Sequence, residues 1–198
     1  MNRKALVYYI NVFLLLLMLT ACTRKTIFSG AGNEPFQSSV STIDKVKLEK
    51  QTHKYGCGAA SLVSVLDYWN IKASQSVIVE NYPPHSKKKG YSAQELKSIA
   101  KAYDTQAFVM QCDKSFLEKQ ILLGRPVIVP LFIVPDWEIF VMGWKIYGDS
   151  YNHYLVVYGF SRDETLLMDP DKGFKAMPTN TFLKMWEVNK QICLLVAK

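Results

Sequence analysis

The chain has 198 residues, which is room for one folded domain and little else. Apolar residues make up 49% of it and charged residues 21%, a balance that argues against global disorder. The formal net charge is +7, but no basic stripe interleaved with aromatic residues and no known nucleic-acid-binding motif accompanies it, so no nucleic acid partner is expected.

The first residues have the pattern of a secretory signal. Arg3 and Lys4 give a positive start, and an apolar run broken only by Asn11 extends to Leu19. This run is short for a membrane span, which needs about 20 apolar residues. The pattern therefore predicts a signal peptide over residues 1–21.

The end of this segment contains a candidate lipid site. Residues 19–22 read LTAC and resemble a bacterial lipobox, in which the cysteine is acylated and becomes the new N-terminus. We therefore predict lipidation of Cys22; the alternative is an uncleaved N-terminal anchor. Either way the domain is expected outside the cytoplasm and tethered to a membrane. Thr23 is not an aspartate, which by analogy favours the outer membrane in a cell with two membranes.

The next segment is polar and lacks a hydrophobic period, so residues 22–45 are predicted to form a flexible tether. A single folded domain is expected over residues 46–198. Its first half contains three predicted helices. The first covers Cys57–Trp69, the second begins at Ser92, which forms a capping box with Glu95, and the third is capped by Asp113.

Strand-like segments dominate the second half. Branched and aromatic residues predict strands at 106–111, 126–133, 153–160, 165–168 and 191–197, with a short helix at 179–186. Because helices come mostly first and strands second, the predicted fold class is α+β, with helices packed on a C-terminal antiparallel sheet.

The stretch from Val134 to Asn152 is rich in aromatic residues. One interpretation is a hairpin that extends the core, and the other is a flap beside a peptide-binding groove. The hairpin is favoured for the whole stretch, with Trp137 and Trp144 as candidate groove residues.

Three residues have the chemistry of an activated thiol. Cys57 stands at a predicted helix N-terminus, where the helix dipole favours the thiolate form. His153 opens a predicted strand, and Asp169 directly follows the next one. If these strands form a hairpin, Asp169 can orient His153 as the base that activates Cys57. Asp171 is the alternative carboxylate.

The joint pattern resembles a known family. Residues 51–60 read QTHKYGCGAA and are similar to the start of the bacteriocin-processing, double-glycine leader peptidases, family thirty-nine of the cysteine peptidases. The strand that begins HYLVVYG at His153 and the pair Asp169-Pro170 also resemble that family. The resemblance covers residues 46–197 and implies a papain-like fold.

The resemblance also implies roles for the matching residues. Cys57 would attack the scissile carbonyl, His153 would take and return the proton, and Asp169 would orient His153. The side chain of Gln51, with the backbone N–H of Cys57, would stabilise the oxyanion. The implied protein is a stand-alone, exported lipoprotein that cleaves a peptide or protein precursor in the cell envelope.

Two other functions stay open at this stage: a cell-wall amidase of the Cys-His type, and an inactive peptidase-like domain that only binds peptides. No cofactor is expected, and no metal, because the close paired ligands of zinc sites are missing. Cys112 and Cys193 lie in or beside strand-like runs. They are either a disulfide or two separate buried thiols.

Overall fold

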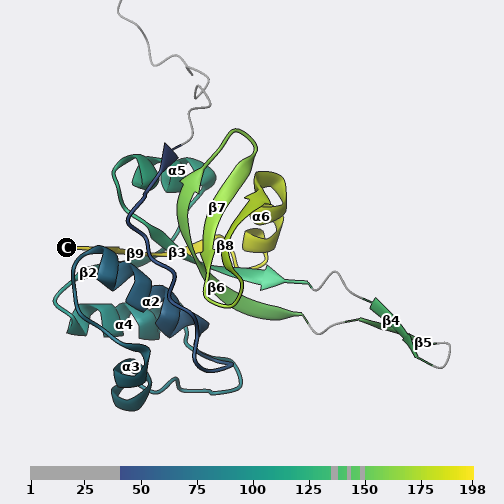
Figure 1. Cartoon of the computed structure of the whole chain (residues 1–198), viewed down its shortest axis with the longest axis horizontal. Coiled ribbons are helices and arrows are strands. Elements are labelled where there is room, and N and C mark those ends of the chain that lie inside the picture. The colour runs from purple at the N-terminus through teal and green to yellow at the C-terminus, as the bar shows by residue number, and fades with distance from the viewer. Residues whose placement is uncertain (1–40, 135–137, 142–143, 148–149) are drawn as a thin grey trace, which may run out of the picture. The chain divides into compact units, whose positions relative to one another are not determined.

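The computed structural model describes residues 41–134, 138–141, 144–147 and 150–198 (Figure 1). Within these ranges the helices are α2 (Cys57–Tyr68), α3 (Gln75–Asn81), α4 (Ala93–Ala102), α5 (Lys114–Leu122) and α6 (Thr179–Glu187). The strands are β1 (Ser41–Thr42), β2 (Gln106–Gln111), β3 (Val127–Ile133), β4 (Glu138–Val141), β5 (Trp144–Tyr147), β6 (Tyr151–Phe160), β7 (Glu164–Asp169), β8 (Gly173–Pro178) and β9 (Ile192–Ala197).

Seven of the strands form one sheet in the order β2-β9-β3-β6-β7-β8, with β1 paired to β6. Every pairing in this sheet is antiparallel. The strands β4 and β5 pair only with each other, as an antiparallel hairpin between β3 and β6 in the chain. The predicted α+β class with an antiparallel sheet is confirmed.

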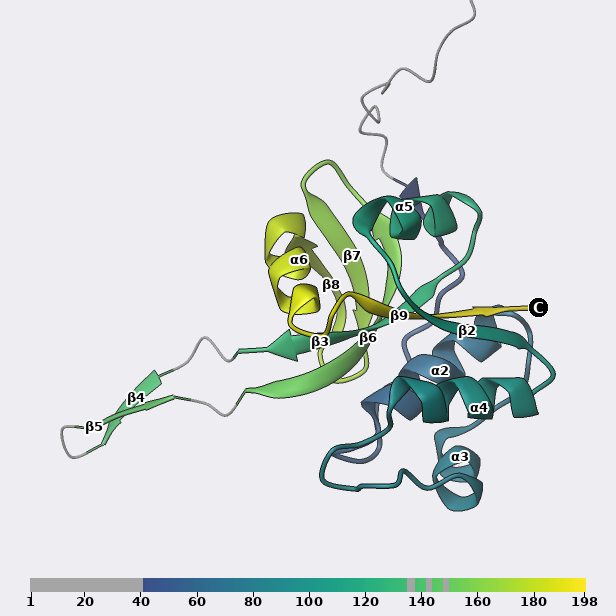
Figure 2. The same cartoon turned by 180° about the vertical axis from the view of Figure 1, so that it is seen from behind.

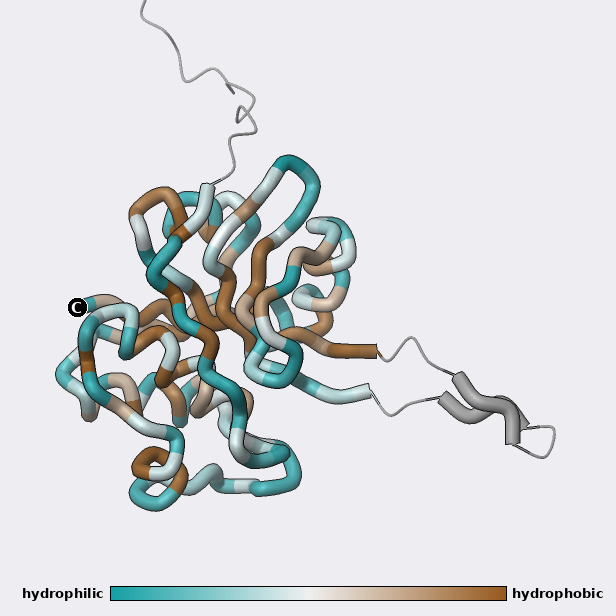
Figure 3. The backbone as a smooth tube through the Cα atoms, in the orientation of Figure 1, coloured by the Kyte–Doolittle hydropathy of each residue, from teal (hydrophilic) through white to brown (hydrophobic). Residues whose placement is uncertain are grey.

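Helices on opposite sides of the domain bury the sheet. Helix α2 packs on β6 and α4 on β2, while α6 packs on β3 and β8 (Figures 1 and 2). The hydrophobic tube segments gather along the central strands, and the connecting loops are mostly hydrophilic (Figure 3). Leu62, Leu66, Leu96 and Trp186 are fully buried in this core. None of the described helices is long and apolar enough to cross a membrane.

The hydrophobic period located most elements correctly, but three were missed: the two-residue strand β1, helix α3 and strand β8. Helix α3 is only seven residues long and four of its positions are exposed, so its hydrophobic period is weak. Strand β8 alternates between exposed and at least partly buried positions, but the exposed Phe174 and the partly buried Lys175 hide that alternation in the sequence. The predicted signal peptide, with Cys22, lies outside the described residues.

The candidate disulfide residues lie close together at one end of the β2–β9 pair. The structure pairs the sulfur atoms of Cys112 and Cys193, whose Cα atoms are 6.6 Å apart. That separation is within the range that disulfides bridge. Antiparallel pairing of Met110 with Cys193 brings the end of β2 beside β9, so the tertiary register creates this proximity.

Candidate active site

Cys57 is the first residue of α2, and it is half-buried. The N-cap is Gly56, which has no side chain to bond the first backbone N–H groups. By contrast, Ser74, Ser92 and Asp113 cap α3, α4 and α5 with side-chain oxygens. The uncapped α2 terminus keeps its partial positive charge for a thiolate or an oxyanion beside Cys57.

Two glycines set the position of this cysteine. A Cβ atom on Gly56 would lie 3.0 Å from the backbone oxygen of His53, inside a tight turn whose Gly56 N–H donates to that oxygen at 2.9 Å. A Cβ atom on Gly58 would lie 3.0 Å from Leu96 and 3.3 Å from Tyr154. The Gly-Cys-Gly sequence therefore lets the first turn of α2 pack tightly against α4 and β6.

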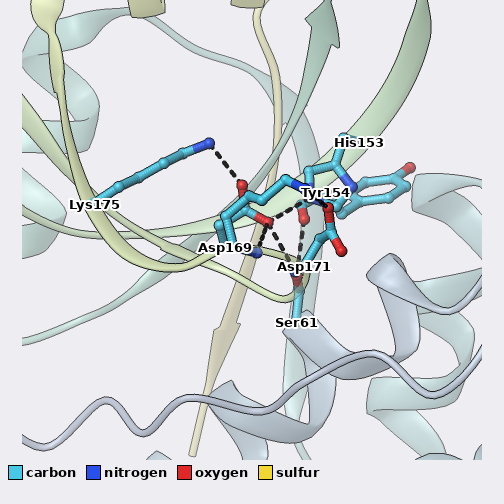
Figure 4. Close-up of polar contacts among 7 residues, drawn as sticks. Ser61, His153, Tyr154, Asp169, Asp171 and Lys175 are labelled. Atoms are coloured by element: carbon cyan, nitrogen blue, oxygen red, sulfur yellow. Dashed lines mark hydrogen bonds and ion pairs between the residues drawn. The ribbon is translucent and has the colours of Figure 1, made fainter.

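His153 lies on β6, the strand on which α2 packs, and it is only 5% exposed. The backbone carbonyl of the next residue in the strand, Tyr154, accepts a hydrogen bond from the Ser61 hydroxyl of α2 at 3.3 Å (Figure 4). This bond ties the helix of the cysteine to the strand of the histidine. His153 is the third residue of the strand, not its first as predicted, because the exposed Tyr151 and Asn152 also pair with β3.

Asp169 is the last residue of β7 and lies beside His153. Its Oδ1 atom accepts a hydrogen bond from Nε2 of His153 at 2.7 Å. The same oxygen accepts from the backbone N–H groups of Asp171 at 2.9 Å and Lys172 at 3.2 Å. The alternative carboxylate, that of Asp171, instead forms an exposed ion pair with Lys172. The turn after β7 thus fixes Asp169, whose side chain is buried.

A fourth polar group at this site, Lys175 of β8, is not indicated by any pattern in the sequence. Its Nζ atom donates to Oδ2 of Asp169 at 2.6 Å, so Asp169 lies between Lys175 and His153 (Figure 4). Strand β8 pairs with β7 in a register that sets Lys175 opposite Leu167, two residues before Asp169. Had the sequence been interpreted as a β7–β8 hairpin, the pairing of the two strands would have placed Lys175 near Asp169.

These contacts raise the pKa of His153 and lower the pKa of Asp169. Burial lowers the pKa of His153, but hydrogen bonds to Asp169 and Cys57 outweigh it and raise that pKa to about 9. Burial raises the pKa of Asp169, but the bonds from His153 and Lys175 outweigh it and hold that pKa well below its usual range. With Nε2 bonded to Asp169, Nδ1 is the ring nitrogen left for Cys57.

Gln51 is held in place by the backbone on both sides. Its own N–H donates to the Pro170 carbonyl at 3.0 Å, next to Asp169. The buried side chain of Gln75 on α3 accepts from the Thr52 N–H at 3.1 Å and donates to the Lys50 carbonyl at 2.7 Å. Gln75 therefore clamps the residues on either side of Gln51, a role that the sequence did not indicate.

A pocket of about 760 Å³ opens beside Cys57. This volume is in the range of ligand sites. Its walls come from α4, β3, β6 and the segments before α4 and β9, and they include Tyr91, Ala93, Pro130, Asn152, Tyr154, Asn189 and Ile192. Of the two candidate groove tryptophans, Trp137 lies outside the described residues, and Trp144 is described only as the backbone start of β5.

Solved structures share this fold. A putative C39-like peptidase from Bacillus anthracis has a TM-score of 0.65 at 16% identity, covering 81% of this chain and 98% of that one. The peptidase domain of Streptococcus ComA, a bifunctional ABC transporter, has a TM-score of 0.59 at 23% identity, covering 77% and 98%. A double glycine motif protease from an AMS/PCAT transporter, in complex with the leader peptide, has a TM-score of 0.58 at 23% identity, covering 79% and 93%.

No curated protein matches the chain in sequence. The model of the peptidase C39 family, however, matches residues 45–198, which is most of the chain and includes every residue of the site described above. The fold of its structural neighbours is papain-like, as the resemblance implied. The chain belongs to the peptidase C39 family.

Proposed function

We propose that this protein is a thiol endopeptidase that cleaves a peptide or protein precursor. The observation that carries the proposal is the buried His153–Asp169 hydrogen bond, 2.7 Å long, beside a cysteine at an uncapped helix N-terminus. Nucleophilic catalysis by a side chain uses this arrangement, in which a carboxylate orients a base and the base activates the nucleophile. A domain that only binds peptides needs no such arrangement.

The chemistry follows from the groups present. The Cys57 sulfur, deprotonated by His153, attacks the scissile carbonyl carbon and forms a tetrahedral intermediate. The backbone N–H of Cys57 and the side-chain amide of Gln51 donate to its oxyanion; donors of this kind are typically worth about 3 kcal/mol each. The C–N bond then breaks, and the imidazolium of His153 protonates the leaving amine. Water hydrolyses the thioester, with His153 as base, and Cys57 is restored.

The pocket beside Cys57 supports a peptide substrate. Its apolar walls and convergent polar groups are typical of ligand sites. A structural neighbour, the double glycine motif protease, was solved with its leader peptide, and a segment of similar kind is the substrate class proposed here.

The test is the rate of iodoacetamide labelling of Cys57 in the full chain purified in detergent. We expect rapid labelling at pH 6, where an ordinary thiol with a pKa of about 8.5 is almost fully protonated. His153→Ala should abolish this rapid phase, and Cys57→Ala should remove the labelled site. Slow labelling with an ordinary thiol profile, unchanged in His153→Ala, would falsify the proposal and favour a domain that only binds peptides.

We further propose that the protein is a lipoprotein of the cell envelope, anchored through Cys22. The signal-like run over residues 1–21 and its LTAC ending support this placement. Cys22→Ser should release the protein from membranes and abolish labelling by a palmitate analogue. Continued sedimentation of Cys22→Ser with membranes would contradict the lipid anchor.

A further inference from the structure

The carboxylate of Asp169 has two cationic neighbours on opposite oxygens. Oδ1 accepts from Nε2 of His153 at 2.7 Å, and Oδ2 accepts from Nζ of Lys175 at 2.6 Å. Two backbone N–H groups of the following turn complete the set on Oδ1. A triad needs only the bond from Asp169 to His153, so the contact with Lys175 requires its own explanation.

This contact differs from the surface ion pairs of the chain. The side chain of Lys175 is 29% exposed and that of Asp169 is 3% exposed, whereas the paired side chains of Lys47 and Asp67 are 75% and 46% exposed. An exposed pair contributes little because water screens it. A partly buried, charge-assisted hydrogen bond is stronger and fixes the orientation of the acceptor.

The strand register explains why Lys175 reaches this oxygen. Asp169 pairs with Gly173 across the β7–β8 ladder, and Lys175 follows two residues later on the same face of β8. Gly173 has a φ of +94°, which allows the tight turn that brings β8 back beside β7. Lys175 therefore approaches Asp169 from the neighbouring strand, on the side away from His153 (Figure 4).

We propose that Lys175 is a positioning residue, which holds Oδ2 of Asp169 so that Oδ1 stays in line with the ring of His153. The inference rests on the proposed peptidase function. Without Lys175, the buried Oδ2 atom of Asp169 loses its cationic partner. Rotation of the carboxylate toward water then competes with the hydrogen bond between Asp169 and His153. Weaker orientation of the ring then reduces the activation of Cys57.

The charged and titratable groups around this pair come from four elements. His153 contacts Asp169 of β7 and Cys57 of α2, and these two groups raise the pKa of His153. Lys175 bonds Asp169, and Asp169 in turn bonds the ring of His153, so the positioning effect of Lys175 on the ring passes through Asp169. The remaining neighbours are Tyr151 of β6, whose ring centroid is 5.9 Å from that of His153, and the exposed pair Asp171 and Lys172 of the turn.

The direction of one shift tests the proposal. NMR titration of the full chain in detergent can follow His153, because the chain has only three histidines. Loss of a nearby positive charge alone raises the pKa of a histidine. Loss of positioning weakens the Asp169–His153 bond and lowers that pKa. We expect Lys175→Met to lower the pKa of His153 by about one unit, a tenfold change in the protonation equilibrium, and to slow labelling of Cys57 at pH 6.

Matched variants complete the test. Lys175→Arg keeps the cation and the donor and should restore both readouts. Lys47→Met removes a lysine from a carboxylate pair at the surface and should change neither. If Lys175→Met does not fold, Lys175→Gln, which keeps a donor without the charge, should lower the pKa by a smaller amount.

Two outcomes overturn the inference, and they are distinguishable. In the first, the wild type has a raised His153 pKa and rapid Cys57 labelling, and both are unchanged or higher in Lys175→Met. This result refutes the role of Lys175 and leaves the peptidase proposal standing. An ordinary His153 pKa near 6.5 with slow Cys57 labelling in the wild type removes the proposed function, and the positioning role with it.

Discussion

The two halves of the candidate site are held in opposite ways. The base half, His153 with Asp169 and Lys175, is a polar network on the sheet in which each oxygen of the Asp169 carboxylate has a partner. The nucleophile half, Cys57 on α2, rests on glycine packing and an apolar helix face, and its helix terminus has no side-chain cap. Hydrogen bonds between buried polar groups fix the base half, and close packing of the backbone fixes the nucleophile half.

This difference has a chemical reason. The base must keep one orientation and one tautomer through the reaction, so its partners are buried and complete. The nucleophile and its backbone N–H must stay free to bond the substrate, so a capping side chain there would compete with the oxyanion. Substitutions in the two halves should therefore fail in different ways.

The largest effect is expected from the centre of the base half. Asp169→Asn removes the charge that His153 and Lys175 share, and an Asn amide can donate to the ring and select the wrong tautomer. By analogy with the serine triad, kcat/KM should fall on the order of 10³–10⁴-fold. Peptide cleavage by the folded variant, with circular dichroism as the control for folding, measures the effect. A greater loss in Asp171→Asn than in Asp169→Asn would move the orienting role to Asp171.

The support of Gln51 should have a smaller effect. Gln75→Ala removes the bonds to the backbone of Lys50 and Thr52, and the segment carrying Gln51 loosens. Loss of one whole oxyanion donor costs about 10²–10³-fold in kcat, so displacement of Gln51 should reduce kcat about tenfold and leave KM nearly unchanged. Gln94→Ala, on the exposed face of α4, is the matched control. A change in KM alone would show that Gln75 acts on substrate binding.

The nucleophile half should be sensitive to a single methyl group. Gly56→Ala places a Cβ atom 3.0 Å from the backbone oxygen of His53, so the turn before Cys57 must shift. We expect Cys57 labelling to slow severalfold and the free energy of unfolding to fall by about 1 kcal/mol. Gly159→Ala is the control, because its Cβ atom would meet Ser41 of β1 at 2.8 Å, away from the site. Equal labelling rates in the two variants would show that the turn tolerates the shift.

The base half should also make stability depend on pH. The folded pKa of His153 is about 9, above its ordinary 6.5, so its contribution is complete below pH 6.5 and is lost as the pH rises through about 9. The pKa of Asp169 is lowered, so its contribution is complete above its ordinary 3.8 and is lost only as the pH falls through the lowered value. Urea unfolding of wild type and His153→Gln should differ most between pH 3.8 and 6.5. A difference that grows toward pH 9 would contradict this pairing.

Much of the arrangement could be predicted from local sequence. The capping box at Ser92 and the cap at Asp113 are confirmed, because such caps depend only on residues three positions apart. The predicted hairpin of β6 and β7 is also confirmed, and it brings His153 and Asp169 within hydrogen-bond distance. The catalytic roles of Cys57, His153, Asp169 and Gln51 stay predictions that the labelling and cleavage experiments test.

The sequence by itself determined the class of the fold, the helix that begins at Cys57 and the segments that carry the candidate chemistry, since short-range periodicity and capping encode these. Only the tertiary structure decided which polar groups support them. Gln75 bonds Lys50 and Thr52, on either side of Gln51, across 25 and 23 residues of sequence. Lys175 reaches Asp169 only through the β7–β8 register. Both residues look like ordinary surface polar residues in the sequence. Their partners depend on strand register and helix packing, and no local pattern specifies either.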